Sequence, residues 1–326
     1  MWREYFTKIG VKYFSRHKGE VNSCVFSPDC QVLLTCSDDC RLFLWDARTG
    51  QLLAKVSGHT GPVKSCVFSQ DCSLFASASH DCTVRIWHTV TTNPMHVLTG
   101  HSKSVETVCF SPDAKWLVSG GWDKTAILWD VQNGEIVRIF SGHQGAIQSS
   151  MFSLTSQYLA TGSWDYTVKV WSVQTEECEK TLKGHSGNVS CVCFSVSGML
   201  ASGSWDRTVR VWHPRRGTLI FLLEGHMGWV KSLAFSRDGI ILASAGEYDT
   251  VRLWDMSSGS CMKSIKDESA VAHGCTFTPS GALLTTGSAD FLLTADNSPE
   301  EQEGDHTEPL QPDTTAEKKV FSPEPN

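Results

Sequence analysis

The sequence predicts an all-β protein built from one unit that is repeated along the chain. A His residue recurs every 41 or 42 residues, preceded by Arg at the first position and by Gly at the others, namely at His17, His59, His101, His143, His185 and His226. Between these positions, short apolar runs alternate with Gly, Asp and Asn, which is the pattern of strands joined by turns. A period of this length is typical of repeat architectures, in which each unit buries its apolar face against its neighbours.

Residues 100–130, GHSKSVETVCFSPDAKWLVSGGWDKTAILWD, show the unit in its clearest form. An alternating strand is expected from Val105 to Phe110, followed by a Ser-Pro-Asp turn and a second strand from Trp116 to Gly120. A third strand ends at Trp129, and a fourth crosses to the next Gly-His pair. Each unit therefore supplies four short strands.

The ordered motifs GH, FSPD, SGxxD and a closing Trp-Asp resemble those of the WD-repeat family, whose repeats form the four-stranded blades of a β-propeller. The resemblance implies an all-β, seven-bladed propeller. Its repeats are expected near 17–57, 59–99, 101–141, 143–183, 185–224, 226–266 and 268–296. The seventh is eroded, because Glu268 stands where the others have His and Asp296 stands where they have Trp.

The two ends of the predicted propeller meet in one blade. The run from Val11 to Phe14 has the character of an outer strand but no repeat ahead of it. In the WD-repeat family such a strand joins the last sheet and closes the ring, which removes exposed sheet edges. We therefore expect an N-terminal extension at 1–7, the propeller at 8–296 and a disordered acidic tail at 297–326.

Composition narrows the class of protein further. The net charge is −7, and the segment 297–326 carries eight acidic residues and two Lys, so the repeats are close to neutral. That balance argues against nucleic-acid binding, which needs a clustered basic surface. With no signal-peptide pattern and no apolar stretch of about 18 residues, the 13 Cys suggest free thiols in a reducing compartment. We expect an intracellular protein, cytoplasmic or nuclear, without metal, cofactor or membrane contact, that acts as a monomer or as a subunit of a larger complex.

One recurring set of four polar residues invites an enzymatic interpretation. Each of five repeats carries His, Ser or Thr, Asp and Trp at nearly fixed offsets, and these sets are His17, Thr35, Asp39, Trp45; His59, Ser77, Asp81, Trp87; His101, Ser119, Asp123, Trp129; His143, Thr161, Asp165, Trp171; and His185, Ser202, Asp206, Trp212. A catalytic site is needed once, so five copies indicate a structural device. The family resemblance implies that Asp holds His, His holds the hydroxyl, and the hydroxyl holds the Trp indole. Other catalytic motifs are missing, and we expect no enzymatic activity.

The last two repeats depart from this set. The sixth keeps His226, Ser244 and Trp254 but has Tyr248 at the Asp position, and the seventh keeps only Thr286 and Asp290. Because buried polar groups need partners, we predict weaker local stability in these two blades.

Binding in the WD-repeat family usually takes place on the top face of the propeller, the end that carries the turn with the repeated Asp. Two positions per repeat are implied to project there. The residue before the Asp reads Asp38, His80, Trp122, Trp164, Trp205, Glu247 and Ala289, and the fifth residue after the His reads Asn22, Lys64, Glu106, Gln148, Ser190, Lys231 and His273.

Three consecutive repeats thus present Trp122, Trp164 and Trp205 on one side of the ring, and Trp229 extends the set. Trp is enriched among residues that dominate binding energy at interfaces, so the sequence predicts a partner-binding surface here, with His80, Lys64 and Lys231 at its borders. The alternative is that these rings only pack against adjacent loops.

A second motif points to a particular partner. Trp45-Asp46-Ala47-Arg48 resembles the sequence by which WD-repeat substrate receptors dock onto the adaptor of a cullin-type ubiquitin ligase, although Arg48 also suits an ordinary polar turn before Gly50. The leading hypothesis is a non-catalytic scaffold that binds peptide segments of partner proteins. The alternatives are a ligase substrate receptor and a chromatin or histone-peptide reader.

Overall fold

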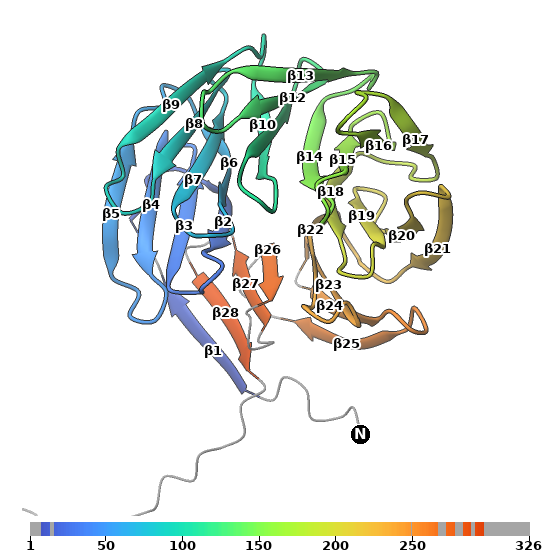
Figure 1. Ribbon diagram of the computed structural model, residues 1–326. Coiled ribbons are helices and arrows are strands. Elements are labelled where there is room, and N and C mark those ends of the chain that lie inside the picture. The colour runs from blue at the N-terminus through green and yellow to red at the C-terminus, as the bar shows by residue number, and fades with distance from the viewer. Residues whose placement is uncertain are drawn as a thin grey trace, which may run out of the picture.

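The structure is a computed structural model that describes the backbone of residues 8–13, 16–248, 250–266, 272–277, 283–287 and 291–296. Within these ranges the strands pair into seven four-stranded sheets, which stand in a ring around a central axis (Figure 1). The prediction of an all-β propeller is therefore confirmed. Nothing in the described part of the chain forms a helix with the length and apolar character needed to cross a membrane.

Six sheets are each built from four consecutive strands, called here the first to sixth blades. The first three blades contain β2 (Val21–Phe26), β3 (Val32–Ser37), β4 (Arg41–Asp46) and β5 (Leu52–Ser57); β6 (Val63–Phe68), β7 (Leu74–Ser79), β8 (Thr83–His88) and β9 (Pro94–Thr99); and β10 (Val105–Phe110), β11 (Trp116–Gly121), β12 (Thr125–Asp130) and β13 (Ile136–Ser141).

The next three blades follow the same plan. They contain β14 (Ile147–Phe152), β15 (Tyr158–Ser163), β16 (Val168–Ser172) and β17 (Cys178–Leu182); β18 (Val189–Phe194), β19 (Leu200–Ser204), β20 (Val209–His213) and β21 (Thr218–Leu223); and β22 (Val230–Phe235), β23 (Ile241–Gly246), β24 (Thr250–Asp255) and β25 (Cys261–Lys266).

The remaining sheet joins the two ends of the chain. It contains β26 (Ala272–Phe277), β27 (Leu283–Gly287), β28 (Phe291–Asp296) and β1 (Lys8–Tyr13). β1 pairs antiparallel with β28, from Lys8 opposite Asp296 to Tyr13 opposite Phe291. The N-terminal strand thus pairs with the last sheet as predicted, although it begins at Lys8 rather than Val11. The side chains of Thr286 and Asp290, the extension 1–7 and the tail 297–326 lie outside the described residues.

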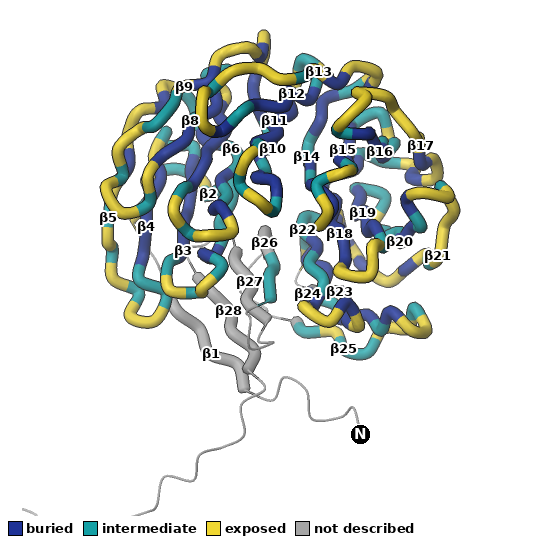
Figure 2. The backbone as a smooth tube through the Cα atoms, viewed as in Figure 1, coloured by how far each residue is buried: buried dark blue, intermediate teal, exposed yellow. Residues whose placement is uncertain are grey.

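The inner strands of neighbouring sheets pack against one another, and β26 contacts both β22 and β2. Apolar side chains from two adjacent blades form most of the core clusters, as where Ile86 and Leu98 of the second blade meet Val105, Leu117 and Trp129 of the third. The outermost strands are largely exposed (Figure 2). Burying one large apolar side chain stabilises the fold by about 1.5–3 kcal/mol. Because these side chains are buried between blades, a blade gains most of its stability from contact with its neighbours.

Candidate protein-interaction site

The four repeated polar residues form one hydrogen-bonded chain in each blade, shown most clearly in the third. The Trp129 indole N–H donates to Ser119 Oγ at 2.8 Å, and the Ser119 hydroxyl donates to His101 Nε2 at 2.8 Å. His101 Nδ1 in turn donates to Asp123 Oδ2 at 2.7 Å. His101, Ser119 and Trp129 are buried. This direction of donation satisfies every polar atom in the chain with one imidazole tautomer.

The carboxylate at the end of this chain also fixes the top-face turn. Asp123 accepts the backbone N–H of Ser102 at 3.0 Å and the hydroxyl of Thr125 at 2.8 Å. Burial raises the pKa of Asp123, but the hydrogen bond and charge of His101 and the bonds from Thr125 outweigh it and lower the pKa to about 2. The next residue, Lys124, has a left-handed backbone with φ 68°. The carboxylate therefore stays ionised and holds two chain segments together.

The same contacts occur in four other blades. The His Nδ1 to Asp distances are 3.0, 2.8, 2.7 and 2.8 Å in the first, second, fourth and fifth blades, and each Trp indole donates to its hydroxyl within 3.0 Å. The hydrogen bonds that the family resemblance implies are thus present in the four other predicted sets as well, namely in His17, Thr35, Asp39, Trp45; His59, Ser77, Asp81, Trp87; His143, Thr161, Asp165, Trp171; and His185, Ser202, Asp206, Trp212. These four sets and the set of the third blade are called the tetrads.

The sixth blade has the contacts among Trp, hydroxyl and His that the tetrads have. Trp254 donates to Ser244 Oγ at 2.8 Å, and Ser244 lies 2.6 Å from His226 Nε2. Tyr248, at the Asp position, is 69% exposed and has φ 61°, one residue earlier in the turn than the left-handed residue of the other five blades. Its side chain consequently points to solvent. Burial, and secondarily the charge of Arg252, lowers the pKa of His226 to about 4.

The four Trp residues predicted for the top face touch one another in a continuous row. Trp122 and Trp164 meet edge to face with ring centroids 4.7 Å apart, and Trp164 and Trp205 lie 5.4 Å apart. Trp205 stacks on Trp229 at 4.1 Å with an interplanar angle of 4°. We call Trp122, Trp164, Trp205 and Trp229 the tryptophan row. Such pairs contribute about 0.5–1.5 kcal/mol each beyond the area they bury.

The row is packed and yet partly open to solvent. Trp122 is 41% exposed and Trp229 is 39% exposed, while Trp164 and Trp205 are half-buried. The Trp164 indole N–H donates to Gln148 Oε1 at 3.0 Å, which joins the two predicted top-face positions of that blade. Both interpretations of these residues are therefore compatible with the geometry, because the rings order one another and still present a surface.

An ion pair borders one end of the row. Lys231 Nζ lies 5.1 Å from the Trp229 ring centroid and 5.9 Å from that of Trp205, within the range of a cation–π contact. The same Nζ lies 3.1 Å from Glu247 Oε1. This lysine and carboxylate cover the stacked pair without adding net charge.

The first two blades make a different, polar arc of the top face. Lys64 Nζ lies 2.8 Å from Asp38 Oδ1, and Asn22 donates to the same oxygen at 2.7 Å. His80 is exposed beside them. The corresponding residues of the closing sheet, Ala289 and His273, have side chains outside the described residues.

The motif that suggests ligase docking lies at the opposite, bottom face, where the third strand of each blade turns into the fourth. Trp45 is buried in its tetrad and is unavailable to a partner. Asp46 accepts the backbone N–H of Thr49 at 2.6 Å, and Arg48 is exposed. The predicted docking residues are therefore divided between core, turn and surface.

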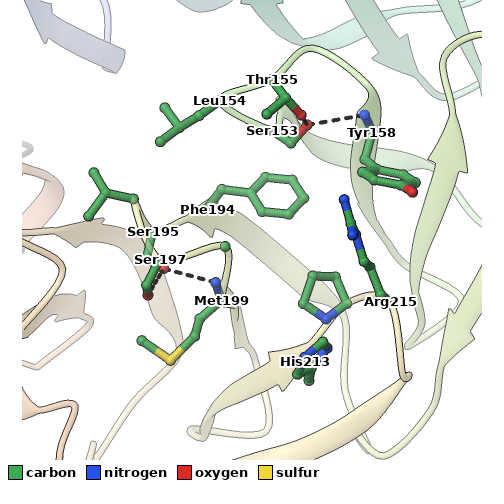
Figure 3. A pocket seen from close by; sticks show the side chains of 13 residues that line it. Ser153, Leu154, Thr155, Tyr158, Phe194, Ser195, Ser197, Met199, His213 and Arg215 are labelled. Atoms are coloured by element: carbon green, nitrogen blue, oxygen red, sulfur yellow. Dashed lines mark hydrogen bonds between the residues drawn. The ribbon is translucent and has the colours of Figure 1, made fainter.

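A cavity of about 370 Å³ lies at the bottom face between the fourth and fifth blades, and sequence reasoning did not identify it (Figure 3). Two turns line it, one with Leu154 and Thr155 and the other with Val196 and Ser197. Four other blades place an Asp where these turns have Thr155 and Ser197, namely Asp29, Asp71, Asp113 and Asp238. That departure from the repeat is the signal that could have revealed the cavity.

The described residues contain no group of three His, Cys, Asp or Glu side chains placed to hold a metal ion. The ring of antiparallel blades and the tetrads define a β-propeller of the repeat type. The WD domain, G-beta repeat family matches the chain at residues 9–46, 50–88, 92–130, 134–172, 176–213 and 217–255. The chain therefore belongs to the WD-repeat family, whose members are generally non-enzymatic scaffolds for protein interactions.

Two relatives share a short stretch with the chain. The human WD repeat-containing protein 38 is 54% identical over 48 residues, which is 15% of this chain and 15% of that protein. The mouse WD repeat-containing protein 38 is 51% identical over 48 residues, or 15% of this chain and 16% of that protein. Each match thus spans about the length of one repeat, which is 15% of the human relative and 16% of the mouse relative.

Proposed function

We propose that the protein is a non-catalytic scaffold that binds peptide segments of partner proteins through the tryptophan row on its top face. The observation that carries this proposal is the row of four rings in contact, from Trp122 to Trp229. Three of them, Trp122, Trp164 and Trp205, stand at the position where the first two blades have the polar residues Asp38 and His80. The repeat does not require Trp there. A fold-neutral position occupied by Trp in three successive blades favours binding over packing.

The packing of the tryptophan row and the charge around it suit a binding surface. Rings that already pack against one another lose little rotamer freedom when a partner docks, so less of the interaction energy is spent on ordering the site. The Lys231–Glu247 pair and the Lys64–Asp38 pair leave the surroundings close to neutral. A largely uncharged peptide with aromatic or aliphatic anchors is therefore the expected partner, rather than nucleic acid.

The scaffold is expected inside the cell, and its ring is expected to count seven blades. The family matches cover six repeats and stop at residue 255, before β25. The sheet formed by β26, β27, β28 and β1 has the strand order of a blade and contacts both neighbours. This supports the interpretation of the eroded seventh repeat as the closing blade.

Proximity labelling in cells tests the proposal. The test protein carries Trp122→Ala, Trp164→Ala and Trp205→Ala together, and the control carries Leu53→Ala, Val97→Ala and Ile139→Ala, three exposed apolar residues of the outer strands. We expect the first variant, at equal folded abundance, to lose most of the labelled partners, and the control to keep them. Unchanged partners with the Trp variant would refute a role for the row.

The ligase-receptor alternative rests on the exposed Arg48 at the bottom face. If the purified chain binds the cullin adaptor and Arg48→Ala abolishes that binding, the result would favour the ligase-receptor hypothesis. A histone-peptide array tests the third hypothesis in the same way, since specific capture of a histone peptide that depends on Trp122 would favour a chromatin reader. Failure of both tests leaves the general scaffold.

A further inference from the structure

The bottom-face cavity between the fourth and fifth blades differs from the equivalent sites around the ring in its charge. In the first, second, third and sixth blades, the turn between the first two strands contains an Asp that accepts the hydroxyl of the preceding Ser, as Asp113 accepts Ser111 at 2.6 Å. In the fourth and fifth blades a hydroxyl replaces that carboxylate. Ser153 Oγ lies 3.4 Å from Thr155 Oγ1, and Ser195 Oγ lies 2.9 Å from Ser197 Oγ. Two neighbouring turns have thus lost their negative charge.

The same two turns have gained apolar side chains. The residue after the Ser is Pro28, Gln70, Pro112 and Arg237 in the other four blades, but Leu154 and Val196 here. Leu154 is 55% exposed and Val196 is 52% exposed. With Phe194, Met199 and Pro214 they line one apolar hollow. Exposed aliphatic residues at both turns of one inter-blade cavity are not required by the fold, because neither packs into a core cluster.

One cation borders this hollow. Arg215, in the turn after β20, is the only charged side chain among the residues that line the cavity. Its guanidinium lies 5.4 Å from the centroid of the Tyr158 ring, and Figure 3 shows the two side by side at one edge of the cavity. A cation–π contact holds the guanidinium in place while its N–H groups stay available to an anion.

From this geometry we propose that the cavity binds an extended segment of a partner protein that inserts one aliphatic side chain beside a carboxylate. The aliphatic group fills the space between Leu154, Val196 and Met199, and the carboxylate pairs with Arg215. A cavity of about 370 Å³ falls in the size range of ligand pockets and accommodates a Leu side chain with its adjoining backbone. The lining offers an anion no competing carboxylate, so the charge of the partner is complementary to the site.

Methyl NMR on the full chain labelled at methionine provides a local readout. The chain has seven Met, of which Met199 lines the cavity, while Met227 is 70% exposed and stands two residues before Trp229. The probe is a synthetic nine-residue Gly/Ser peptide with a central Leu flanked by two Glu, titrated to a few millimolar. We expect a saturable shift of the Met199 methyl and no shift of Met227. A matching peptide with Ala in place of Leu should bind at least about tenfold more weakly.

Four variants sharpen the test. Arg215→Glu should weaken the Met199 response at least about tenfold, whereas Arg48→Glu, the same charge change at the equivalent turn position of the first blade, should leave it unchanged. Ser197→Asp restores the carboxylate that four other blades carry, so the variant should fold normally and still repel the acidic peptide. The triple Trp variant of the top face should keep the Met199 response, which separates this site from the proposed function.

Several results would overturn the proposal. A shift of Met227 without Met199, equal effects of Arg215→Glu and Arg48→Glu, or equal binding of the Leu and Ala peptides would each show that the cavity does not recognise the pair of groups. A Met199 signal that stays unmoved at millimolar peptide would do the same.

Discussion

Trp122 and Asp123 are neighbours in one turn of the third blade, yet their side chains serve two different parts of the molecule. Asp123 turns inward, bonds to His101 at 2.7 Å and recurs in five blades. Trp122 turns outward, is 41% exposed, and has counterparts of the same kind in only two further blades. The tetrads and the tryptophan row thus differ in how often they recur: a residue repeated in five blades supports the blade, and a residue that only three blades carry is available for binding.

The largest expected effect comes from removing the Trp of a tetrad. Trp129 is 1% exposed and lies in the cluster between the second and third blades, so Trp129→Ala should lower the free energy of unfolding by about 3–5 kcal/mol. Trp122→Ala removes the same side chain from the row and should cost about 1 kcal/mol or less, because the ring is partly in solvent before the change. Urea unfolding of both variants measures the difference. Equal losses would break the distinction between tetrad and row.

The sixth blade should make stability depend on pH between about 6.5 and 4. The pKa of His226 falls from 6.5 in the unfolded chain to about 4 in the fold, so the unfolded state binds the proton first as the pH drops. The stabilising contribution is therefore complete above pH 6.5 and is lost as the pH falls toward 4, by about 2–3 kcal/mol at pH 4.5.

Denaturation curves at a series of pH values test this effect. His226→Gln should be less stable at neutral pH but should show a flatter pH dependence over the same window. Burial also lowers the pKa of His59 from 6.5, so His59 contributes to the same window and the slope of the variant should flatten only in part. An unchanged slope in the variant would show that His226 is not the group responsible.

A smaller effect is expected in local opening. In the sixth blade Tyr248 stands where the third blade has Asp123, the carboxylate that accepts the backbone N–H of Ser102, and the Tyr248 side chain is 69% exposed. Amides of β23 and β24 should therefore exchange with solvent more readily than those of β11 and β12, with an opening free energy lower by about 1 kcal/mol. Hydrogen exchange read by mass spectrometry resolves the two blades, and equal protection would contradict the expectation.

Much of this architecture was predictable because the repeat period fixes the positions of the strands along the chain. The spacing of the His residues located the strands to within a few residues, and the fixed offsets of His, Ser or Thr, Asp and Trp identified each tetrad before its distances were known. The strands and tetrads depend on local spacing, which a repeat preserves. The exposure of Trp122 was implied by the resemblance to the WD-repeat family, in which the residue before the repeated Asp projects from the top face.

What escaped prediction depends on conformation or on comparison across blades. The left-handed backbone at Tyr248, one residue earlier than in the other turns, decides where its side chain points. The residue type alone does not predict that conformation. The stacking of Trp205 on Trp229 joins two blades through a residue outside the repeated positions. The sequence marks the bottom-face cavity only through the difference between Thr155 and Ser197 and the Asp of the other turns. Its two walls come from segments about 42 residues apart.

The most direct test of the distinction is a paired measurement on Trp122→Ala and Asp123→Ala, each assayed for thermal unfolding and for partner recovery per folded molecule. We expect Trp122→Ala to unfold within a few degrees of the wild-type temperature and to lose partners. Asp123→Ala should unfold at a lower temperature while its folded fraction keeps them. The reverse assignment, or loss of both properties in both variants, would contradict the claim that the repeated residue builds the blade and its neighbour binds the partner.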